Sequence, residues 1–360
     1  MATTNTRYVD PNAAAGGNGT TNALSGANCA YQSLSIWEAA RQADLPTGDI
    51  IERVICASNQ DAGGGSADTT ACTINGWTTD ATRYIQIEAA TSHGGIWNDN
   101  IYRLSPTDST CIDLAEDYVN FIGLQISNSS PTANSRHIID INVSYPANNA
   151  LFFSKCIFKG HNHATYTQKG YSNNEAVKAT FRNCIFYNIK PITGNYGIVC
   201  ENVSNATIAI DNTTVIGGDI GIWRRASTIT ARNCYVGNTS TSDYSGTITK
   251  TTCASEDTSG SAGLQSIAYS TATFTNVTAG SEDYHLVVGS ALIGVGTDLS
   301  ATFTDDIDGQ TRPTGAGTWD IGADEYVSTA IKTILGLAKA SVKTVDGLAI
   351  ASVKTWGGLT

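Results

Sequence analysis

Acidic and basic side chains in the middle of the chain are of the types that cleave polysaccharides. Glycosidases use two carboxyl groups about 5 to 10 Å apart, and lyases combine aspartates that bind calcium with a basic residue that removes a proton. The acidic candidates are Asp113, Glu116, Asp117, Asp140 and Glu175, and the basic candidates, which could also bind sugars, are Lys159, Lys169, Arg224, Arg225 and Arg232. None falls in a recognisable catalytic motif, so the catalytic residues stay unassigned, and solvated charges in turns explain the same residues.

Two histidines are spaced as metal ligands can be. His161 and His163 would place two imidazoles on one side of a strand or loop. No cysteine or carboxylate adjoins them closely, so we predict no metal site. His93, His137 and His285 stand singly and are expected to have structural roles.

Aspartates also gather in the segment 305–309, Asp-Asp-Ile-Asp-Gly. The segment lacks the downstream glutamate of a helix-loop-helix calcium site, so it is interpreted as a turn, with weak calcium binding as the alternative. We predict no cofactor.

Exposed aromatic rings could stack on sugars. The aromatic residues near predicted turns are Trp97, Tyr166, Tyr171, Trp223 and Tyr244. Any exposed member of this set is a candidate sugar platform.

Composition favours a protein built from many short strands. Small polar residues are abundant, and charged residues make up only 15% of the 360 residues, which disfavours both a helical bundle and a disordered chain. After Tyr326 there are four lysines and one aspartate, so this end carries +3 and the rest carries −14 of the total of −11. An acidic body disfavours nucleic acid as a partner, because phosphate binding needs lysine and arginine.

The cysteines and the N-terminus indicate a cytoplasmic origin. The nine cysteines are odd in number and include no Cys-x-x-Cys pair, and several lie in apolar patterns such as that around Cys156. Buried free thiols are therefore expected rather than disulfides. No signal peptide and no apolar run long enough for a membrane span is visible, so we expect synthesis in a reducing cytoplasm.

The elements that would position these residues are one short helix and many strands. Ser35 to Glu38 match a capping box followed by helical spacing, which Leu45-Pro46 should end. From about residue 50 the apolar residues alternate as in strands.

The strand patterns recur every 20 to 30 residues. Asn183-Cys184-Ile185-Phe186 resembles Lys155-Cys156-Ile157-Phe158 at an offset of 28, and related segments begin at 121, 212, 233 and 274. This repetition predicts a solenoid with one coil per repeat. A β-sandwich is the alternative, but it needs tight hairpin turns that are scarce here.

Two blocks of the sequence resemble right-handed parallel β-helix proteins of the pectin-lyase-like superfamily. The opening block contains Tyr8-Val9-Asp10-Pro11-Asn12, Gly16-Gly17-Asn18-Gly19-Thr20 and Tyr31-Gln32-Ser33-Leu34. The closing block contains Asp283-Tyr284-His285-Leu286, Asp308-Gly309-Gln310-Thr311-Arg312-Pro313 and Asp320-Ile321-Gly322-Ala323-Asp324-Glu325-Tyr326. The resemblance implies an all-β right-handed parallel β-helix with an N-terminal capping helix, and it says little about function because the superfamily includes lyases, hydrolases, adhesins and phage spikes.

The last thirty residues repeat with a period of eleven. The matched positions are Lys332, Lys343 and Lys354, and Leu337, Leu348 and Leu359. These repeats resemble those that end phage virion proteins. Strands and turns are favoured, since a glycine every eleventh residue opposes a helix; an eleven-residue helical supercoil is the alternative. The array is expected to anchor the protein through these six residues, although the lysines are equally explained as solvated charges.

Together these features predict a cap (1–49), a β-helix body (50–327) and an anchoring tail (328–360). We expect a bacteriophage structural protein on the virion surface, either a head fibre or decoration protein or a tail fibre or spike. Its expected partners are other copies in a homotrimer, capsid or tail proteins, and host surface polysaccharide. The alternative is a polysaccharide-degrading depolymerase or lyase.

Overall fold

The computed structural model describes residues 2–58, 65–128, 136–141, 150–161, 167–201, 205–315 and 319–327, with four two-residue strands beyond them. Two compact units are separated, Met1–Glu325 and Tyr326–Thr360. Among the described helices, none is long and apolar enough to cross a membrane.

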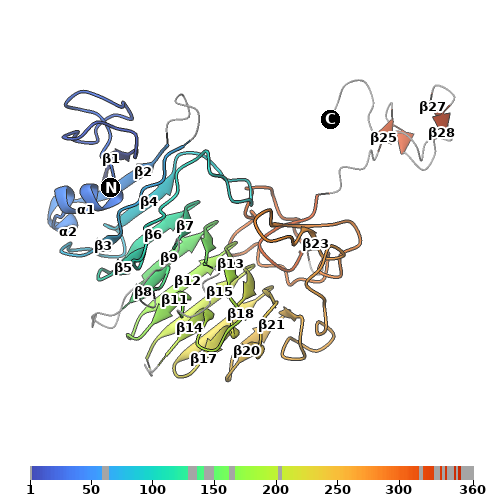
Figure 1. Cartoon of the computed structure of the whole chain (residues 1–360). Helices are drawn as coiled ribbons and strands as arrows, with labels where there is room; N and C mark the ends of the chain where they lie inside the picture. The colour runs from blue at the N-terminus through green and yellow to red at the C-terminus, as the bar shows by residue number, and fades with distance from the viewer. Residues whose placement is uncertain are drawn as a thin grey trace. The chain divides into compact units, whose positions relative to one another are not determined.

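Three parallel sheets wind through the first unit (Figure 1). Sheet 1 contains, in spatial order, β1 (Thr3–Val9), β2 (Ile50–Cys56), β4 (Ile85–Ala89), β6 (Val119–Ile122), β9 (Ala150–Ser154), β12 (Lys178–Arg182), β15 (Thr207–Asp211), β18 (Thr228–Arg232) and β21 (Thr249–Thr251). Sheet 2 contains β7 (Gln125–Ser127), β10 (Ile157–Lys159), β13 (Ile185–Ile189), β16 (Thr214–Gly217), β19 (Tyr235–Gly237) and β22 (Ala254–Ser255). Sheet 3 contains β3 (Cys72–Ile74), β5 (Ile112–Leu114), β8 (Ile139–Ile141), β11 (Lys169–Asn173), β14 (Tyr196–Cys200), β17 (Ile220–Arg224) and β20 (Ser242–Ser245).

The chain visits sheets 1, 2 and 3 in turn, one strand per sheet in each coil, from β6 onward. Strands of neighbouring coils pair in parallel, as β10 does with β13 and β12 with β15. This architecture is the predicted right-handed parallel β-helix, in keeping with the hand of nearly all parallel crossovers. It excludes the sandwich, which needs antiparallel pairs.

From β9 to β18, a left-handed residue follows each sheet 1 strand and turns the chain into sheet 2. The φ angles of Lys155, Asn183, Asn212 and Asn233 lie between 44° and 54°. Asparagine tolerates this region better than most residues because its short side chain can bond locally. The repeat found in the sequence therefore marks the same corner of successive coils.

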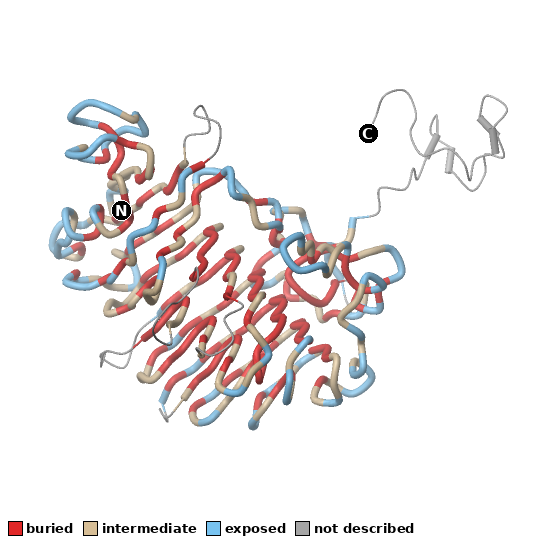
Figure 2. Tube along the Cα trace, viewed as in Figure 1, coloured by how far each residue is buried: buried red, intermediate tan, exposed pale blue. Residues whose placement is uncertain are grey.

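The cysteines that follow this corner point inward, as predicted. Cys156, Cys184 and Cys234 have no exposed surface, and Thr213 takes the equivalent position between the last two. All nine cysteines are buried and free. Phe153 stacks between Phe121 and Phe181, with ring centroids 4.9 and 4.7 Å apart, so these rings form a ladder across three coils. Buried residues recur in every coil (Figure 2).

The N-terminal region differs from the prediction in three ways. Strand β1 pairs with β2 along its whole length, so residues 1–49 supply a strand as well as a cap. The helix α1 (Leu34–Arg41) is capped by Ser33, whose hydroxyl accepts the Ile36 N–H at 3.1 Å, rather than by Ser35. A second short helix, α2 (Leu45–Gly48), begins where a helix end was predicted, because Pro46 fits a first helical turn.

The coils end earlier than predicted, at β22 rather than near residue 327. Side chains of the following loop replace a further coil: Asp257, Ser259 and Ser261 accept backbone N–H groups of the last coil at about 3.0 Å. The segment 274–277, predicted to be a further coil, forms β23 (Phe274–Asn276) and pairs antiparallel with β24 (Asp283–Leu286).

The rest of the closing block lies beside the coils and contacts their corners. Asn212 donates to the carbonyls of Asp320 and Gly322 at 3.0 and 3.1 Å. Arg312 is fully buried between Glu325 and Asn183. The block therefore braces the solenoid from the side.

The second unit shows two short antiparallel hairpins, as the strand interpretation predicted. They are β25 (Thr333–Ile334) with β26 (Leu337–Ala338), and β27 (Thr344–Val345) with β28 (Leu348–Ala349). Leu337 and Leu348 thus begin equivalent strands. Leu359, Lys332, Lys343 and Lys354 lie outside the described residues, so the anchoring role stays a prediction.

Candidate functional site

Three adjoining hollows lie over the C-terminal ends of the sheet 2 strands and together form a groove. Their volumes are about 320, 440 and 190 Å³. The first two share Trp97, Asp99 and Lys159, and the last two share Glu282 and the hairpin β23–β24. We call the three hollows together the groove; the loop 92–105 and the hairpin line its sides.

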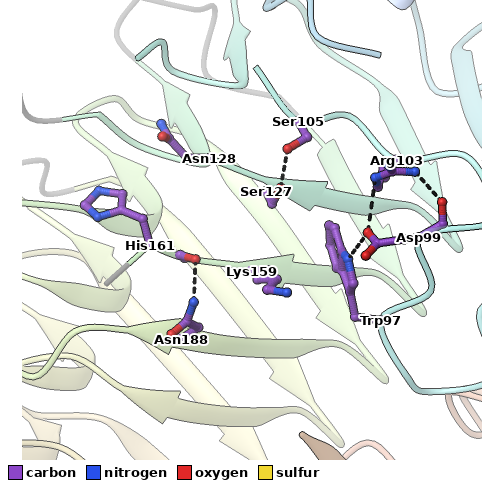
Figure 3. Close-up of a pocket in the computed structure, with 10 residues that line it drawn as sticks. Trp97, Asp99, Arg103, Ser105, Ser127, Asn128, Lys159, His161 and Asn188 are labelled. Atoms are coloured by element: carbon purple, nitrogen blue, oxygen red, sulfur yellow. Dashed lines mark hydrogen bonds and ion pairs between the residues drawn. The ribbon is translucent and has the colours of Figure 1, made fainter. Parts of the chain in front are cut away.

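Strand register places the floor residues side by side. Lys159 at the end of β10 pairs with Ser127 on β7 and with Tyr187 on β13. Neighbouring strands lie about 4.8 Å apart, so these three side chains occupy consecutive rungs. Asn128 and Asn188 follow one residue later and line the same groove (Figure 3).

Lys159 lies between two aromatic rings. Its Nζ is 4.9 Å from the centroid of the Trp97 ring and 5.7 Å from that of Tyr187. Arg103 instead pairs with Asp99 at 3.3 Å, and no ion pair to Lys159 occurs among the described residues. Contacts of a cation with aromatic faces stabilise its position without neutralising its charge, so Lys159 keeps a charge available to a ligand.

The loop that carries Trp97 is fixed on its C-terminal side by Gln125. This fully buried side chain accepts the Asn98 N–H at 2.6 Å and donates to the Asn98 carbonyl at 3.0 Å. The Trp97 Nε1–H donates to Asp99 Oδ1 at 2.9 Å (Figure 3). These bonds orient the indole beside Lys159.

Asn128 carries a buried acceptor at one end of the groove. Asn128 is 1% exposed and donates from Nδ2 to the Ser109 carbonyl at 2.6 Å, but no described group donates to its Oδ1. Leaving a buried acceptor unpaired costs about 1 to 3 kcal/mol. The oxygen has almost no exposed surface, so a ligand hydroxyl would reach it only after neighbouring groups move.

A cluster of charges supports the hairpin wall. His285 lies between Asp283 and Asp308, with Nδ1 to Oδ1 2.5 Å and Nε2 to Oδ2 2.9 Å. Although burial opposes the charge, these carboxylates raise the pKa of His285 to about 10. His285, Asp308 and Asp324 can bring one ligand atom each within 4.8 Å of one another. Both ring nitrogens already face carboxylates, so we interpret the cluster as an ion-paired imidazolium; the absence of a metal site stays a prediction.

Two predicted carboxylates meet on sheet 3, away from the groove. Asp113 on β5 and Asp140 on β8 are register partners. Burial, and then the nearby Asp140 charge, raise the pKa of Asp113. Their spacing is compatible with a glycosidase pair.

The other charged candidates are dispersed. Burial raises the pKa of Glu116 to about 7 and that of Asp117 to about 6 in the turn after β5. Lys169 and Arg225 both pair with Glu201. Arg232 pairs with Asp211 at 2.7 Å, and Arg224 donates to the Ser227 carbonyl. Glu175 lies in the loop after β11.

Of the aromatic candidates, Trp97 lies in the groove. Tyr171 and Tyr244 are buried in the core, where they cannot meet a sugar. Trp223 packs against Tyr196 at 4.6 Å. Tyr166 lies outside the described residues.

Among the histidine candidates, His161 lines the groove. His163 lies outside the described residues, so the pair stays untested. Burial is the main cause that lowers the pKa values of His93 and His137.

Sequence reasoning missed Tyr187 and Asn128. The offset of 28 residues that relates Cys156 to Cys184 also relates Lys159 to Tyr187. Carrying the repeat three residues further would have placed this tyrosine beside the lysine.

Comparison with known proteins adds little. No protein-family model and no curated protein matches the chain. A solved structure of the pectate lyase Pel9A is similar over 90% of this chain and 97% of that one, with 14% identity and a TM-score of 0.34.

Proposed function

We propose that this protein is a glycan-binding β-helix carried on a bacteriophage particle. The observation that supports glycan binding is the position of Lys159 between Trp97 and Tyr187, in the groove that Asn128 also lines. An aromatic face suits the C–H face of a sugar, the amide oxygen suits a hydroxyl, and the ammonium suits an acidic substituent.

The length of the groove favours a chain of several sugars over a single one. Its lining residues come from five neighbouring coils, between Ser127 on β7 and Asn238 after β19. Four strand spacings of about 4.8 Å give a floor of about 19 Å. A polymer lying along the solenoid could therefore contact one rung after another.

A panel of purified bacterial capsules and lipopolysaccharides, screened for binding to the full chain, tests this function. Retention of at least one polysaccharide, lost on changing Trp97 to Ala, supports it. Retention by none, or equal retention by the Trp97→Ala protein, contradicts it.

The particle role is a proposal from the sequence. The tail repeats and the free, buried thiols support a protein made in the host cytoplasm and attached to capsid or tail proteins, in a homotrimer whose copies share the tail contact. Mass spectrometry of purified particles would find the chain if this is right. Its absence from particles, with abundance in the culture medium, would favour a secreted protein.

The pairing of Asp113 with Asp140 supports glycoside hydrolysis as a second candidate. Register partners have Cα atoms about 4.8 Å apart, which can place two carboxyl groups at the separation of a retaining glycosidase, and the raised pKa of Asp113 suits a general acid. New reducing ends from a bound polysaccharide, lost in Asp113→Asn and Asp140→Asn, would establish it. Polysaccharide that stays uncut would exclude it.

A further inference from the structure

The loop that carries Trp97 is held on its N-terminal side by one histidine. His93 is 6% exposed and its ring bonds to two backbone groups. The Gly95 N–H points at Nδ1 at 3.0 Å, and Nε2 lies 2.7 Å from the Lys155 carbonyl oxygen. A backbone N–H can only donate and a carbonyl can only accept, so the ring is neutral with its proton on Nε2.

A second proton on His93 would break this arrangement. It would have to go to Nδ1, where it meets the Gly95 N–H, so one bond becomes a contact between two donors. The new charge would also be buried near the imidazolium of His285. Asp308 opposes part of this effect, yet burial dominates and lowers the pKa of His93.

Two glycines with left-handed backbone conformations follow His93 in the loop. Gly94 and Gly95 adopt φ angles of 56° and 68°. A Cβ on Gly95 would lie 2.7 Å from Asp308 and from His285, so the loop packs directly on that ion pair. Trp97 follows two residues later. Loss of the His93 ring contacts would remove the bond that ties the N-terminal side of this loop to the Lys155 carbonyl.

We propose that His93 is a pH-sensitive latch that holds Trp97 over the groove near neutral pH and releases it in mild acid. This regulation acts on the proposed glycan site, but the loop movement does not depend on glycan binding. In the latched state the pKa of His93 is lower than that of an ordinary histidine. The free-energy preference for the latched state is therefore complete above the ordinary pKa of about 6.5 and declines as the pH falls below it. The ratio of released to latched protein should rise up to tenfold per pH unit in that range.

Other charged groups near the latch respond differently. His285 has a pKa of about 10 and stays charged, and its contact lowers the pKa of Asp308. Lys155 pairs through Nζ with Asp305 at 2.5 Å. Asp324, whose burial raises its pKa to about 6, titrates in the same range. A variant at Asp324 must therefore accompany the test.

Fluorine NMR of protein labelled with fluorotryptophan reports the latch without any ligand. The chain has six tryptophans, and Trp97→Phe identifies the Trp97 signal. Between about pH 8 and pH 5, this signal is expected to shift or broaden with a midpoint below about 6.5. His93→Gln should abolish the change, because a glutamine amide can accept from Gly95 and donate to Lys155 but does not titrate.

Each outcome decides the proposal. A change that persists in Asp324→Asn and vanishes in His93→Gln supports the latch. A constant Trp97 signal, a change that persists in His93→Gln, or one that vanishes in Asp324→Asn overturns it. Failure of every polysaccharide to bind would refute the glycan function and leave this result standing.

Discussion

Arg312 donates from Nη2 to Asn183 Oδ1 at 3.3 Å, across 129 residues of sequence. The same guanidinium pairs through Nη1 with Glu325 at 2.8 Å, and Arg312 has no exposed surface. The buried ion pair lies within the closing block, and its guanidinium bonds the block to a corner of the solenoid. The block also carries Asp308, on which the Trp97 loop packs, so this contact supports the wall of the groove.

Changing Arg312 to Met should destabilise the fold strongly. Removing one partner of a buried pair leaves the other charge unpaired and typically costs about 3 to 5 kcal/mol. Urea unfolding measures the loss. The control Arg225→Gln breaks the ion pair with Glu201, in which the Arg225 side chain is 41% exposed. It should lower the free energy of unfolding by less than about 1 kcal/mol. Equal effects of both substitutions would show that the buried pair is not a brace.

The corner asparagines should be sensitive to their backbone conformation. Asn212 has a φ of 44° and two bonds to the closing block. Asn212→Gly loses the two hydrogen bonds but adopts the left-handed backbone without strain. Asn212→Ala loses the same bonds and is also strained in this conformation, so it should lower the stability by about 1 kcal/mol more than the glycine variant. Thermal unfolding of the two variants gives this difference. An alanine variant as stable as the glycine variant would contradict the strain argument.

Stability should fall as Glu116 ionises. Burial raises its pKa from 4.5 to about 7 in the folded state. Its stabilising contribution is therefore complete below about pH 4.5 and lost as the pH rises to about 7. Glu116→Gln should remove this part of the pH dependence, because the amide oxygen can still accept the Trp77 N–H. Unfolding free energies measured across this range test the slope, and an unchanged slope would show that other groups cause it.

Deleting residues 328–360 should leave a soluble β-helix that no longer joins its particle or oligomer. If Leu337, Leu348 and Leu359 are buried at equivalent places in the assembly, each contributes about 1.5 to 3 kcal/mol. Circular dichroism tests the fold, and sedimentation tests assembly. Normal assembly of the shortened chain would end the anchoring proposal.

The sequence predicted the repeated parts of the molecule better than the parts that dock on them. The shared pattern around Cys156 and Cys184 identified the corner of the coils because stacked coils impose the same inward positions. Phe274 was misassigned because a strand pattern does not tell parallel from antiparallel pairing. The lateral position of Arg312 has no local signal.

For the candidate site, the sequence identified single residues and missed their combination. Trp97 and Lys159 were candidates, but their contact depends on a loop that crosses to another coil. Asp113 and Asp140 were candidates, and only the strand register shows them as partners.

The groove is tested most directly by calorimetric titration with an oligosaccharide cut from whichever polysaccharide the chain retains. Trp97→Ala and Lys159→Gln should each weaken binding at least about tenfold, equivalent to about 1.4 kcal/mol. Lys178→Gln, which changes an exposed lysine on β12 that lines none of the three hollows, should leave affinity unchanged. Native affinity in both groove variants, with all proteins equally folded, would contradict the assignment of the groove as the glycan site.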